Sequence, residues 1–473
     1  MHLVGADISL LRAALETPPA PPYACSHGVP LECALRHLAT IGRWTAVRLR
    51  LFVDPSAGEE QLPNDLPYTL AAAADANAAG LGVVLALHYS DTWADPGQQT
   101  VPAAWAAEAA AAADEAAAAA EADDEQADID SCRRDATVAT LTARVRAYTT
   151  EVVDAFVEAG IRLVGVQVGN EVRNGLLWPS GQLFDMMCAA DTPADDDGCD
   201  GIEANPSTPE GAPGGVAALD AVAAYLLAGA EGVRASTAPP DTPLILHLDR
   251  GDCLPIVAGT LRPLAARQAL SPFDILGFSY HPKHHPGGLA ALSDTLSTVA
   301  RDYSKDVVLM EVCFPYTGAE WEPDAEKWAW PVTPDGQAGF VRDVVEVVRS
   351  VGRGGDYQEL EGEGVPVDCD CKAEEGGGAG VEGDSGGGRR GHGVGVFWWQ
   401  PEAVDGYGLG SVWEGGRYSL FRCDGVALPA AAAFADARAE EVGDGHGDEE
   451  GDGEEGRACR VCPCGGPMDV EAA

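Results

Sequence analysis

Short apolar segments recur along the chain, and each is followed by a polar or glycine-containing loop. Their lengths and their content of branched apolar residues are typical of buried strands. There are eight, at residues 3–11, 45–53, 81–89, 161–169, 243–249, 273–280, 306–312 and 393–399.

Ala- and Leu-rich stretches with helical spacing lie between these segments. The stretch at residues 139–160 places five apolar side chains near one helical face: Leu141, Val145, Tyr148, Val152 and Phe156. Gly160 is positioned to end that helix, because glycine readily adopts the left-handed backbone found after a helix C-terminus.

Strands that alternate with amphipathic helices predict βα units around a parallel sheet, and eight such units predict a closed barrel. An open doubly wound sheet is the competing layout. It would need a glycine-rich turn after the first strand, and "GADISLL" at residues 5–11 does not supply one. We therefore predict an α/β fold, a (β/α)8 TIM barrel, over residues 1–435.

Three segments inside that range are interpreted as insertions. Residues 106–135 are rich in Ala, Asp and Glu and predict an acidic, largely solvated helix. Residues 189–215 are rich in Asp, Pro and Gly, and residues 353–393 are rich in Gly and Glu with almost no apolar content. The last of these, and an acidic Gly-rich tail at residues 436–473, are predicted to be disordered.

The charge of the chain excludes some partners. The net charge is −45 and the pI is about 4.3. A chain this acidic repels nucleic acid and anionic membrane surfaces, whereas a neutral substrate is not disfavoured. We see no run of eighteen strongly apolar residues, which argues against a transmembrane helix. The N-terminus "MHLVGADISLL" lacks the features of a secretory signal.

The chain has 13 cysteines, an odd number. Cys25 with Cys33, and Cys188 with Cys199, are close enough in sequence for short disulfides. Scattered free thiols are an equal alternative, because spacing alone decides little.

Polar and aromatic residues follow most of the predicted strands, where the active site of a βα barrel lies. They include Arg48, Arg50, His88, Asp91, Trp93, Asp95, Asn170, Glu171, Trp178, His247, Asp249, Tyr280, Glu311 and Trp399. Tryptophan faces stack on sugar rings, and charged or amide groups bind hydroxyls. The set predicts a carbohydrate site.

Glu171 and Glu311 each follow an apolar strand directly, and the fourth and seventh strands lie across the barrel mouth from one another. Glycoside hydrolysis needs two carboxyl groups, one that donates a proton and one that attacks or activates water. Asn170 could bind the sugar 2-hydroxyl. A single strand-end glutamate is more often a helix cap or part of a surface ion pair. Two glutamates among the polar and aromatic residues around one barrel mouth favour catalysis.

The sequence resembles glycoside hydrolase family 53, the arabinogalactan endo-β-1,4-galactanases, from Gly5 to about Pro401. Eight motifs carry the resemblance in order: "GADIS", "VRLRLFVDP", "YSDTWADPGQQ", "VQVGNEVRNGLLWP", "LHLD", "DILGFSYHP", "DVVLMEV" and "GVFWWQP". It implies a clan A barrel and a retaining double displacement on the β-1,4-galactan of type I arabinogalactan in pectin.

The resemblance also implies residue roles. Glu171 would be the acid/base and Glu311 the nucleophile. The remaining positions would bind substrate: Asn170, Arg48, His88, Asp91, Trp93, Trp178, Asp249, Tyr280 and Trp399. The chain departs from the family in the sixth-strand loop, where "SYHPKHHPGG" replaces a pattern close to "SYYPxWHG". Gln400 stands where the family often has Glu. The lost Trp implies one weaker sugar subsite.

No metal or other cofactor is predicted. His281, His284 and His285 lack an evident further ligand, and "CRVCPC" and "CDC" supply fewer thiols than the four ligands of a zinc site. The insertion at 353–393 shows no calcium-type oxygen spacing. The expected partner is a polysaccharide, bound by a monomer outside the cell.

Two alternatives stay open. One is another clan A endo-glycosidase, a mannanase or glucanase, against which the "YSDTWADPGQQ" loop argues. The other is a galactan-binding protein without activity, against which both glutamates and Asn170 argue.

Overall fold

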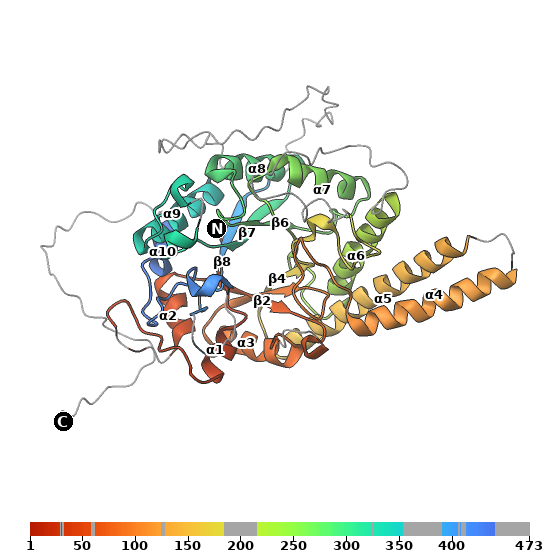
Figure 1. Cartoon of the computed structure of the whole chain (residues 1–473), viewed down its shortest axis with the longest axis horizontal. Coiled ribbons are helices and arrows are strands. Elements are labelled where there is room, and N and C mark those ends of the chain that lie inside the picture. The colour runs from red at the N-terminus through yellow and green to blue at the C-terminus, as the bar shows by residue number, and fades with distance from the viewer. Residues whose placement is uncertain are drawn as a thin grey trace, which may run out of the picture.

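Eight parallel strands close into a barrel in the computed structural model of the chain (Figure 1). Residues 1–439 are described, apart from residues 29, 31–32, 58–61, 124–127, 184–214, 323–324, 353–389, 405–406 and 408–412. The strands pair in chain order and β8 pairs with β1, which confirms the predicted (β/α)8 fold. They are β1 (Leu3–Asp7), β2 (Ala46–Leu51), β3 (Gly82–Leu87), β4 (Leu163–Val168), β5 (Leu244–Leu248), β6 (Ile275–Tyr280), β7 (Asp306–Val312) and β8 (Gly393–Trp399).

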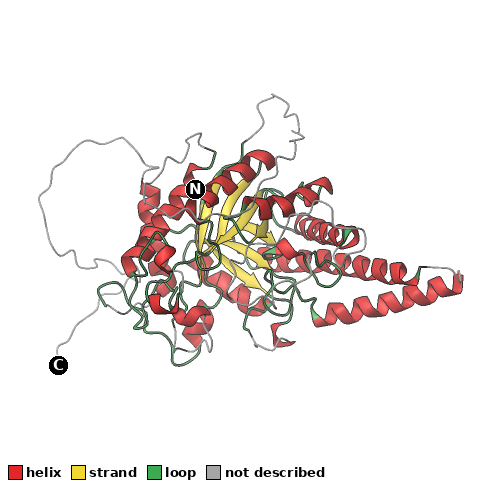
Figure 2. Ribbon diagram, turned by 45° about the horizontal axis from the view of Figure 1, so that its top comes forward, coloured by secondary structure: helices red, strands yellow, loops and turns green. Residues whose placement is uncertain are grey.

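Helices surround the barrel on the outside (Figure 2). They are α1 (Leu11–Glu16), α2 (Ala34–Ile41), α3 (Leu66–Ala78), α4 (Ala103–Asp123), α5 (Ile129–Glu158), α6 (Val216–Ala235), α7 (Leu254–Ala266), α8 (Gly288–Tyr303), α9 (Pro334–Ser350) and α10 (Ala430–Ala439). The last helix lies against α2 and α9 and runs slightly past the boundary predicted at residue 435. The tail beyond it lies outside the described residues.

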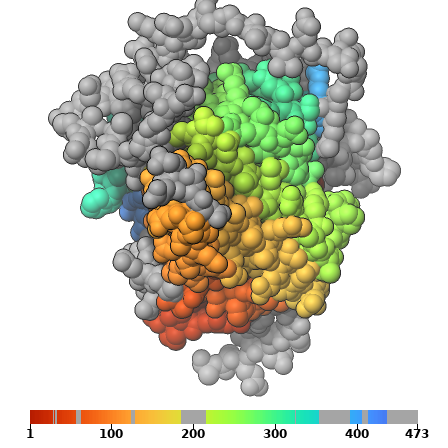
Figure 3. Space-filling view, turned by 90° about the vertical axis from the view of Figure 1, so that its right-hand side faces the viewer, coloured from red at the N-terminus to blue at the C-terminus, as the bar shows by residue number. Residues whose placement is uncertain are grey.

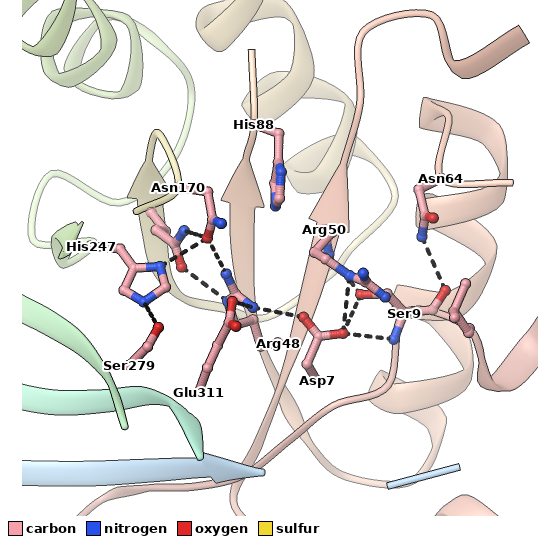
Figure 4. A network of polar contacts seen from close by, with 12 residues as sticks. Asp7, Ser9, Arg48, Arg50, Asn64, His88, Asn170, His247, Ser279 and Glu311 are labelled. Carbon is pink, nitrogen blue, oxygen red and sulfur yellow. Dashed lines mark hydrogen bonds and ion pairs between the residues drawn. The ribbon is translucent and has the colours of Figure 1, made fainter. Parts of the chain in front are cut away.

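Side chains along each strand alternate between the barrel interior and the surrounding helices. One interior cluster is apolar: Leu3, Ala46, Val84, Ile245, Ile275, Val308, Met310, Val394 and Phe397. Two residues further along the inward faces of β2 and β5, Arg48 and His247 occupy the interior instead (Figure 4). The interior therefore changes from apolar to polar toward the carboxyl ends of the strands.

The outward-facing side chains pack against the helices. On α5, Leu141, Val145 and Phe156 are buried in this larger core, as the helical spacing predicts. The helix ends at Glu158, and Gly160 follows with φ +71°. The glycine thus takes the left-handed backbone that the sequence predicts for it.

Helix α6 corrects the prediction that no apolar segment is long enough to cross a membrane, because by length and composition alone α6 could do so. In the structure, 61% of its apolar window is buried, and α6 packs against β4 and α5. Gly229 permits the close approach, because a Cβ there would come within 2.5 Å of Val168.

The segment at residues 106–135 contains most of α4 and the start of α5, which project from the barrel as a hairpin (Figures 1 and 2). Most of its described residues are exposed, as predicted for a largely solvated helix, although Ala109, Ala113 and Ala117 of α4 are buried. Figure 3 views the molecule along the direction of this projection, with the hairpin in orange facing the viewer.

The remaining predictions about segments divide into two groups. Cys25 and Cys33 are not joined by a disulfide, so the structure favours the alternative of separate thiols there. Cys188 and Cys199, most of the segments at 189–215 and 353–393, and the motifs "CDC" and "CRVCPC" lie outside the described residues.

Candidate active site

Strand β4 ends in a turn with two left-handed positions. Gly169 has φ +74° and Glu171 has φ +47°, and Asn170 lies between them. A non-glycine residue in this region costs on the order of 1 kcal/mol or more, and such residues concentrate at functional sites. The turn directs Asn170 into the buried interior and Glu171 toward β6.

Asn170 is the centre of a buried hydrogen-bond network (Figure 4). Its Oδ1 lies 2.6 Å from Nη2 of Arg48, 2.9 Å from Nε2 of Gln167 and 2.8 Å from Nδ1 of His247. Its Nδ2 donates to the backbone oxygen of Ala94 at 2.8 Å. These partners fix which amide atom is the oxygen, and they leave a second Nδ2 hydrogen for a ligand.

Glu311 on β7 is a buried carboxylate with partners on both oxygens. Nη1 of Arg48 lies 2.8 Å from Oε1, and Nε2 of His281 lies 3.7 Å from Oε2. His281 is itself held, since its Nδ1 lies 3.0 Å from Sγ of Cys313. The side chain is 5% exposed, so pairing is required to offset its desolvation.

Asp7 completes the charged network from β1. Its carboxylate lies 2.9 Å from Nη1 of Arg48 and 3.3 Å from Nε of Arg50, and it accepts from the Ser9 hydroxyl at 2.6 Å. Asp7 and both arginines are fully buried. The two guanidinium groups thus face two carboxyl groups, Asp7 and Glu311.

Glu171 and Glu311 lie at the same part of the barrel mouth. Oγ of Ser279 is 2.5 Å from Oε1 of Glu171, and Ser279 is aligned with Glu311 where β6 pairs with β7. Burial raises the pKa of Glu171 well above its usual range, and the negative charges of Glu311 and Asp249 add to this effect. A protonated carboxyl beside an arginine-bound one can supply an acid and a nucleophile.

Trp93 and Trp399 form an aromatic wall, and the guanidinium group of Arg50 packs against both rings. Their ring centroids are 6.0 Å apart, and Cζ of Arg50 lies 4.3 Å from the Trp93 ring and 4.7 Å from the Trp399 ring. Cation–π contacts of this kind favour one orientation of each ring. Indole faces held in this way suit the apolar face of a sugar.

His88 follows β3 and is buried beside this wall. Its Nδ1 accepts from the backbone N–H of Ala94 at 3.3 Å, and its ring meets Phe52 edge-on. Burial, with the charges of Arg48 and Arg50, lowers the pKa of His88 well below its usual range. The imidazole is therefore neutral and contributes hydrogen bonding rather than charge.

Asp91, predicted to bind substrate, binds the protein backbone instead with both carboxylate oxygens. Its two carboxylate oxygens accept backbone N–H groups, from Asp54 at 3.0 Å and from Ala103 at 2.8 Å. Both oxygens are thus used to join the loops after β2 and β3 to the start of α4.

Asp249 and Trp178 lie at the β4 and β5 side of the mouth. Oδ1 of Asp249 is 2.8 Å from Nε of Arg173. The Trp178 indole N–H donates to the backbone oxygen of Asn174 at 2.9 Å. The Trp178 side chain lines a cavity of about 390 Å³, which is otherwise walled mainly by α4 and α5.

Tyr280 is the site residue whose predicted position is wrong. It is 1% exposed, and its ring packs at 6.1 Å from that of Phe340 on α9, outside the barrel. Because strand side chains alternate, its neighbour Ser279 points inward and reaches Glu171 and His247. The prediction chose the last residue of β6, but the inward-facing residue is the one before it.

Three inward residues were not among the predicted site residues: Asp7, Gln167 and Ser279. Each is fully buried and belongs to the network described above. Counting by twos from Leu3 and Ile275 of the inner apolar cluster would have found Asp7 and Ser279, whereas β4 contributes no buried residue to that cluster from which Gln167 could be counted. Within the described ranges, no group of three or more His, Cys, Asp or Glu side chains is placed to hold a metal ion.

A closed βα barrel with two carboxyl groups and two adjoining tryptophans at its mouth defines the class of protein as a glycoside hydrolase. Comparison with known proteins then gives the family. The chain belongs to glycosyl hydrolase family 53, whose family model matches residues 3–118 and 122–434.

Several curated relatives resemble the chain over most of its length. The probable arabinogalactan endo-beta-1,4-galactanase A of Aspergillus terreus is 32% identical over 309 residues, which cover 64% of this chain and 70% of the relative. The arabinogalactan endo-beta-1,4-galactanase of Thermothelomyces thermophilus is 29% identical over 320 residues, which cover 65% and 74%.

Solved structures support the fold. A structure from a study of two fungal beta-1,4-galactanases has a TM-score of 0.62 at 24% identity, and it covers 92% of this chain and 98% of its own. The catalytic domain of a family 53 protein from Ignisphaera aggregans also has a TM-score of 0.62, at 21% identity, and covers 92% and 95%.

Proposed function

We propose that the protein is an endo-acting β-1,4-galactanase that cleaves galactan of type I arabinogalactan with retention of anomeric configuration. The observation that carries the proposal is that Ser279 binds Glu171 and is aligned with Glu311 in the register of β6 and β7, which puts both glutamates at the same part of the barrel mouth. The printed names of the relatives support galactan as the substrate.

The proposed reaction has two displacements. Glu311 attacks the anomeric carbon and forms a glycosyl ester, while Glu171 gives its proton to the departing glycosidic oxygen. Glu171, now ionised, then removes a proton from water as that water attacks the anomeric carbon. The ester bond breaks, Glu311 regains its charge, and Glu171 is again protonated.

The surrounding residues would bind and orient the sugar. The free Nδ2 hydrogen of Asn170 would bind the 2-hydroxyl at the cleaved bond, and Trp399 and Trp93 would stack on sugar rings. Arg48 would act through Glu311, which it contacts directly.

Other predicted binding residues would complete the proposed site. His88, Asp249 and Trp178 would line the groove. Asp91 would act indirectly by holding the loop that carries Trp93, since both its oxygens bind backbone. The substrate is a cell-wall polysaccharide, so we further propose that the enzyme works outside the cell.

The test is product analysis on linear β-1,4-galactan. The wild type is expected to release short oligosaccharides from internal bonds, with the β-anomer formed first. Glu311→Gln is expected to lose nearly all turnover and still fold, whereas Glu320→Gln, at an exposed position after β7, is expected to keep it. Near-normal activity of Glu311→Gln would refute the assignment.

The two rival functions have separate signatures in the same assay. Faster release of reducing sugar from mannan or cellulose than from galactan would identify another endo-glycosidase. Binding to galactan without hydrolysis over long incubation would identify a binding protein.

A further inference from the structure

Four polar side chains form a continuous hydrogen-bonded series across β4, β5 and β6. Nδ1 of His247 lies 2.8 Å from Oδ1 of Asn170, and Nε2 of His247 lies 3.0 Å from Oγ of Ser279. That same Oγ is 2.5 Å from Oε1 of Glu171. Figure 4 shows the part of this series that joins Asn170, His247 and Ser279. The hydrogen-bonded series thus begins and ends on two consecutive residues, Asn170 and Glu171.

The direction of each hydrogen bond in this series follows from Asn170, whose amide orientation is fixed. Oδ1 of Asn170 accepts from Arg48 and Gln167, while Nδ2 donates to a backbone oxygen, so the amide cannot be reversed. An amide oxygen can only accept. Nδ1 of His247 must therefore carry a hydrogen.

His247 has only that one ring hydrogen to give. Burial lowers the pKa of its imidazole well below the usual range, and the charge of Arg48 adds to this, so the ring is neutral. A neutral imidazole protonated on Nδ1 has a bare Nε2 that can only accept. Ser279 must then donate its single hydroxyl hydrogen to Nε2.

With that hydrogen used, Ser279 can only accept from Glu171. We infer that Ser279 and His247 are positioning residues that hold the proton on Glu171, in a chain that runs from Glu171 to Ser279, His247 and Asn170. The separation of 2.5 Å is short enough for an O–H···O bond in either direction, so the direction is set by the hydrogen that Ser279 gives to His247. The inference rests on the proposed function, in which Glu171 is the acid, and identifies which residues keep that acid protonated.

Other groups also face Glu171 and must be separated from this effect. Glu311 comes from β7, Asp249 follows β5 and is paired with Arg173, and Asp95 lies in the loop after β3. Their charges and the burial of Glu171 raise the pKa of Glu171 whatever Ser279 does, whereas a hydrogen bond donated by Ser279 to the ionised carboxylate would lower it. The direction in which a Ser279 substitution shifts the pKa of Glu171 distinguishes a Ser279 hydroxyl that donates to Glu171 from one that accepts from it.

A hydroxyl that donates to a carboxylate stabilises the ionised form, so its removal raises the pKa of the carboxyl group. A hydroxyl that accepts from the acid stabilises the protonated form, so its removal lowers that pKa. The proposed acid must be protonated to work. The alkaline limb of the pH profile therefore moves to lower pH only in the second case.

The experiment compares pH profiles of kcat/KM on linear galactan. Ser279→Ala is expected to move the alkaline limb to lower pH by about half a unit or more. His247→Phe is expected to do the same. His247→Gln, whose amide offers one donor and one acceptor, is expected to keep the wild-type limb, as is Ser293→Ala, a buried serine on α8.

A limb that stays in place or moves to higher pH in Ser279→Ala would overturn the inference, and so would an equal shift in His247→Gln and His247→Phe. A second readout does not need turnover. Carboxyl-¹³C-labelled glutamate, with Glu171→Gln to identify the signal, is expected to titrate at lower pH in Ser279→Ala. If the wild type leaves galactan intact, the proposed function fails, while this titration still decides the inference.

Discussion

Arg48 and Glu311 form a buried ion pair across the barrel, from β2 to β7, with Nη1 2.8 Å from Oε1. The same guanidinium group reaches Asp7, Gln167 and Asn170. One arginine thus ties four strands together at the level where the proposed chemistry occurs. Its contribution to stability and to the site is therefore inseparable.

Removal of Arg48 should be severe. Arg48→Met leaves two buried carboxyl groups without their partner, which we expect to cost about 3–5 kcal/mol of unfolding free energy. Arg12→Met, which removes a surface ion pair with Glu16 and Asp75, should cost about 1 kcal/mol or less. Urea unfolding measures both, and equal losses would contradict the proposed difference.

His281 should act on the nucleophile rather than on substrate binding. Its Nε2 faces Oε2 of Glu311 while Cys313 fixes the other ring nitrogen. We expect His281→Ala to lower kcat by about 10- to 100-fold with little change in KM, because a displaced nucleophile slows attack. His284→Ala removes a ring that also packs on Trp413 and should keep the wild-type kcat. A raised KM at normal kcat would instead place His281 on the sugar.

Glu402 should make stability depend on pH. Burial raises its pKa from 4.5 to about 8. Between these values the unfolded chain releases a proton that the folded chain keeps, so the folded state loses stability as pH rises, by about 1.4 kcal/mol per pH unit at most. Glu402→Gln keeps an acceptor for the Leu10 N–H and lacks the titration. Its Tm relative to wild type should rise from pH 5 to pH 8, and a constant difference would refute this.

The distal part of the α4–α5 hairpin should be dispensable for turnover. Replacement of residues 116–131 by a short turn removes only the projecting end (Figure 1). The aromatic contacts of Trp105 with Tyr148 and Tyr89 at the base remain. We expect unchanged kcat/KM on galactan, whereas Trp105→Ala should cost about 3–5 kcal/mol of unfolding free energy. A large loss of activity in the shortened protein would show that the hairpin takes part in function.

Much of the fold is visible in the sequence because buried parallel strands are marked by continuous apolar runs. All eight strands lie inside the predicted segments, and the α5 core face was identified from its spacing. The segment at residues 106–135 was predicted to be helical and largely exposed, but the contact between α4 and α5 was not predicted, because an alanine-rich acidic stretch has no strong apolar face. The buried alanines of α4 come from one helix packing on the other, which no local pattern records.

The site was predicted less completely than the fold. The sequence alone determined that Glu171, Glu311, Asn170, Arg48 and the tryptophans belong to strand ends. Only the tertiary structure decided that Ser279 rather than Tyr280 points inward, and that Asp7, Gln167 and His247 join the network. The physical reason is that strand ends are local properties, whereas a hydrogen-bond network exists only when side chains from different strands meet across the closed barrel.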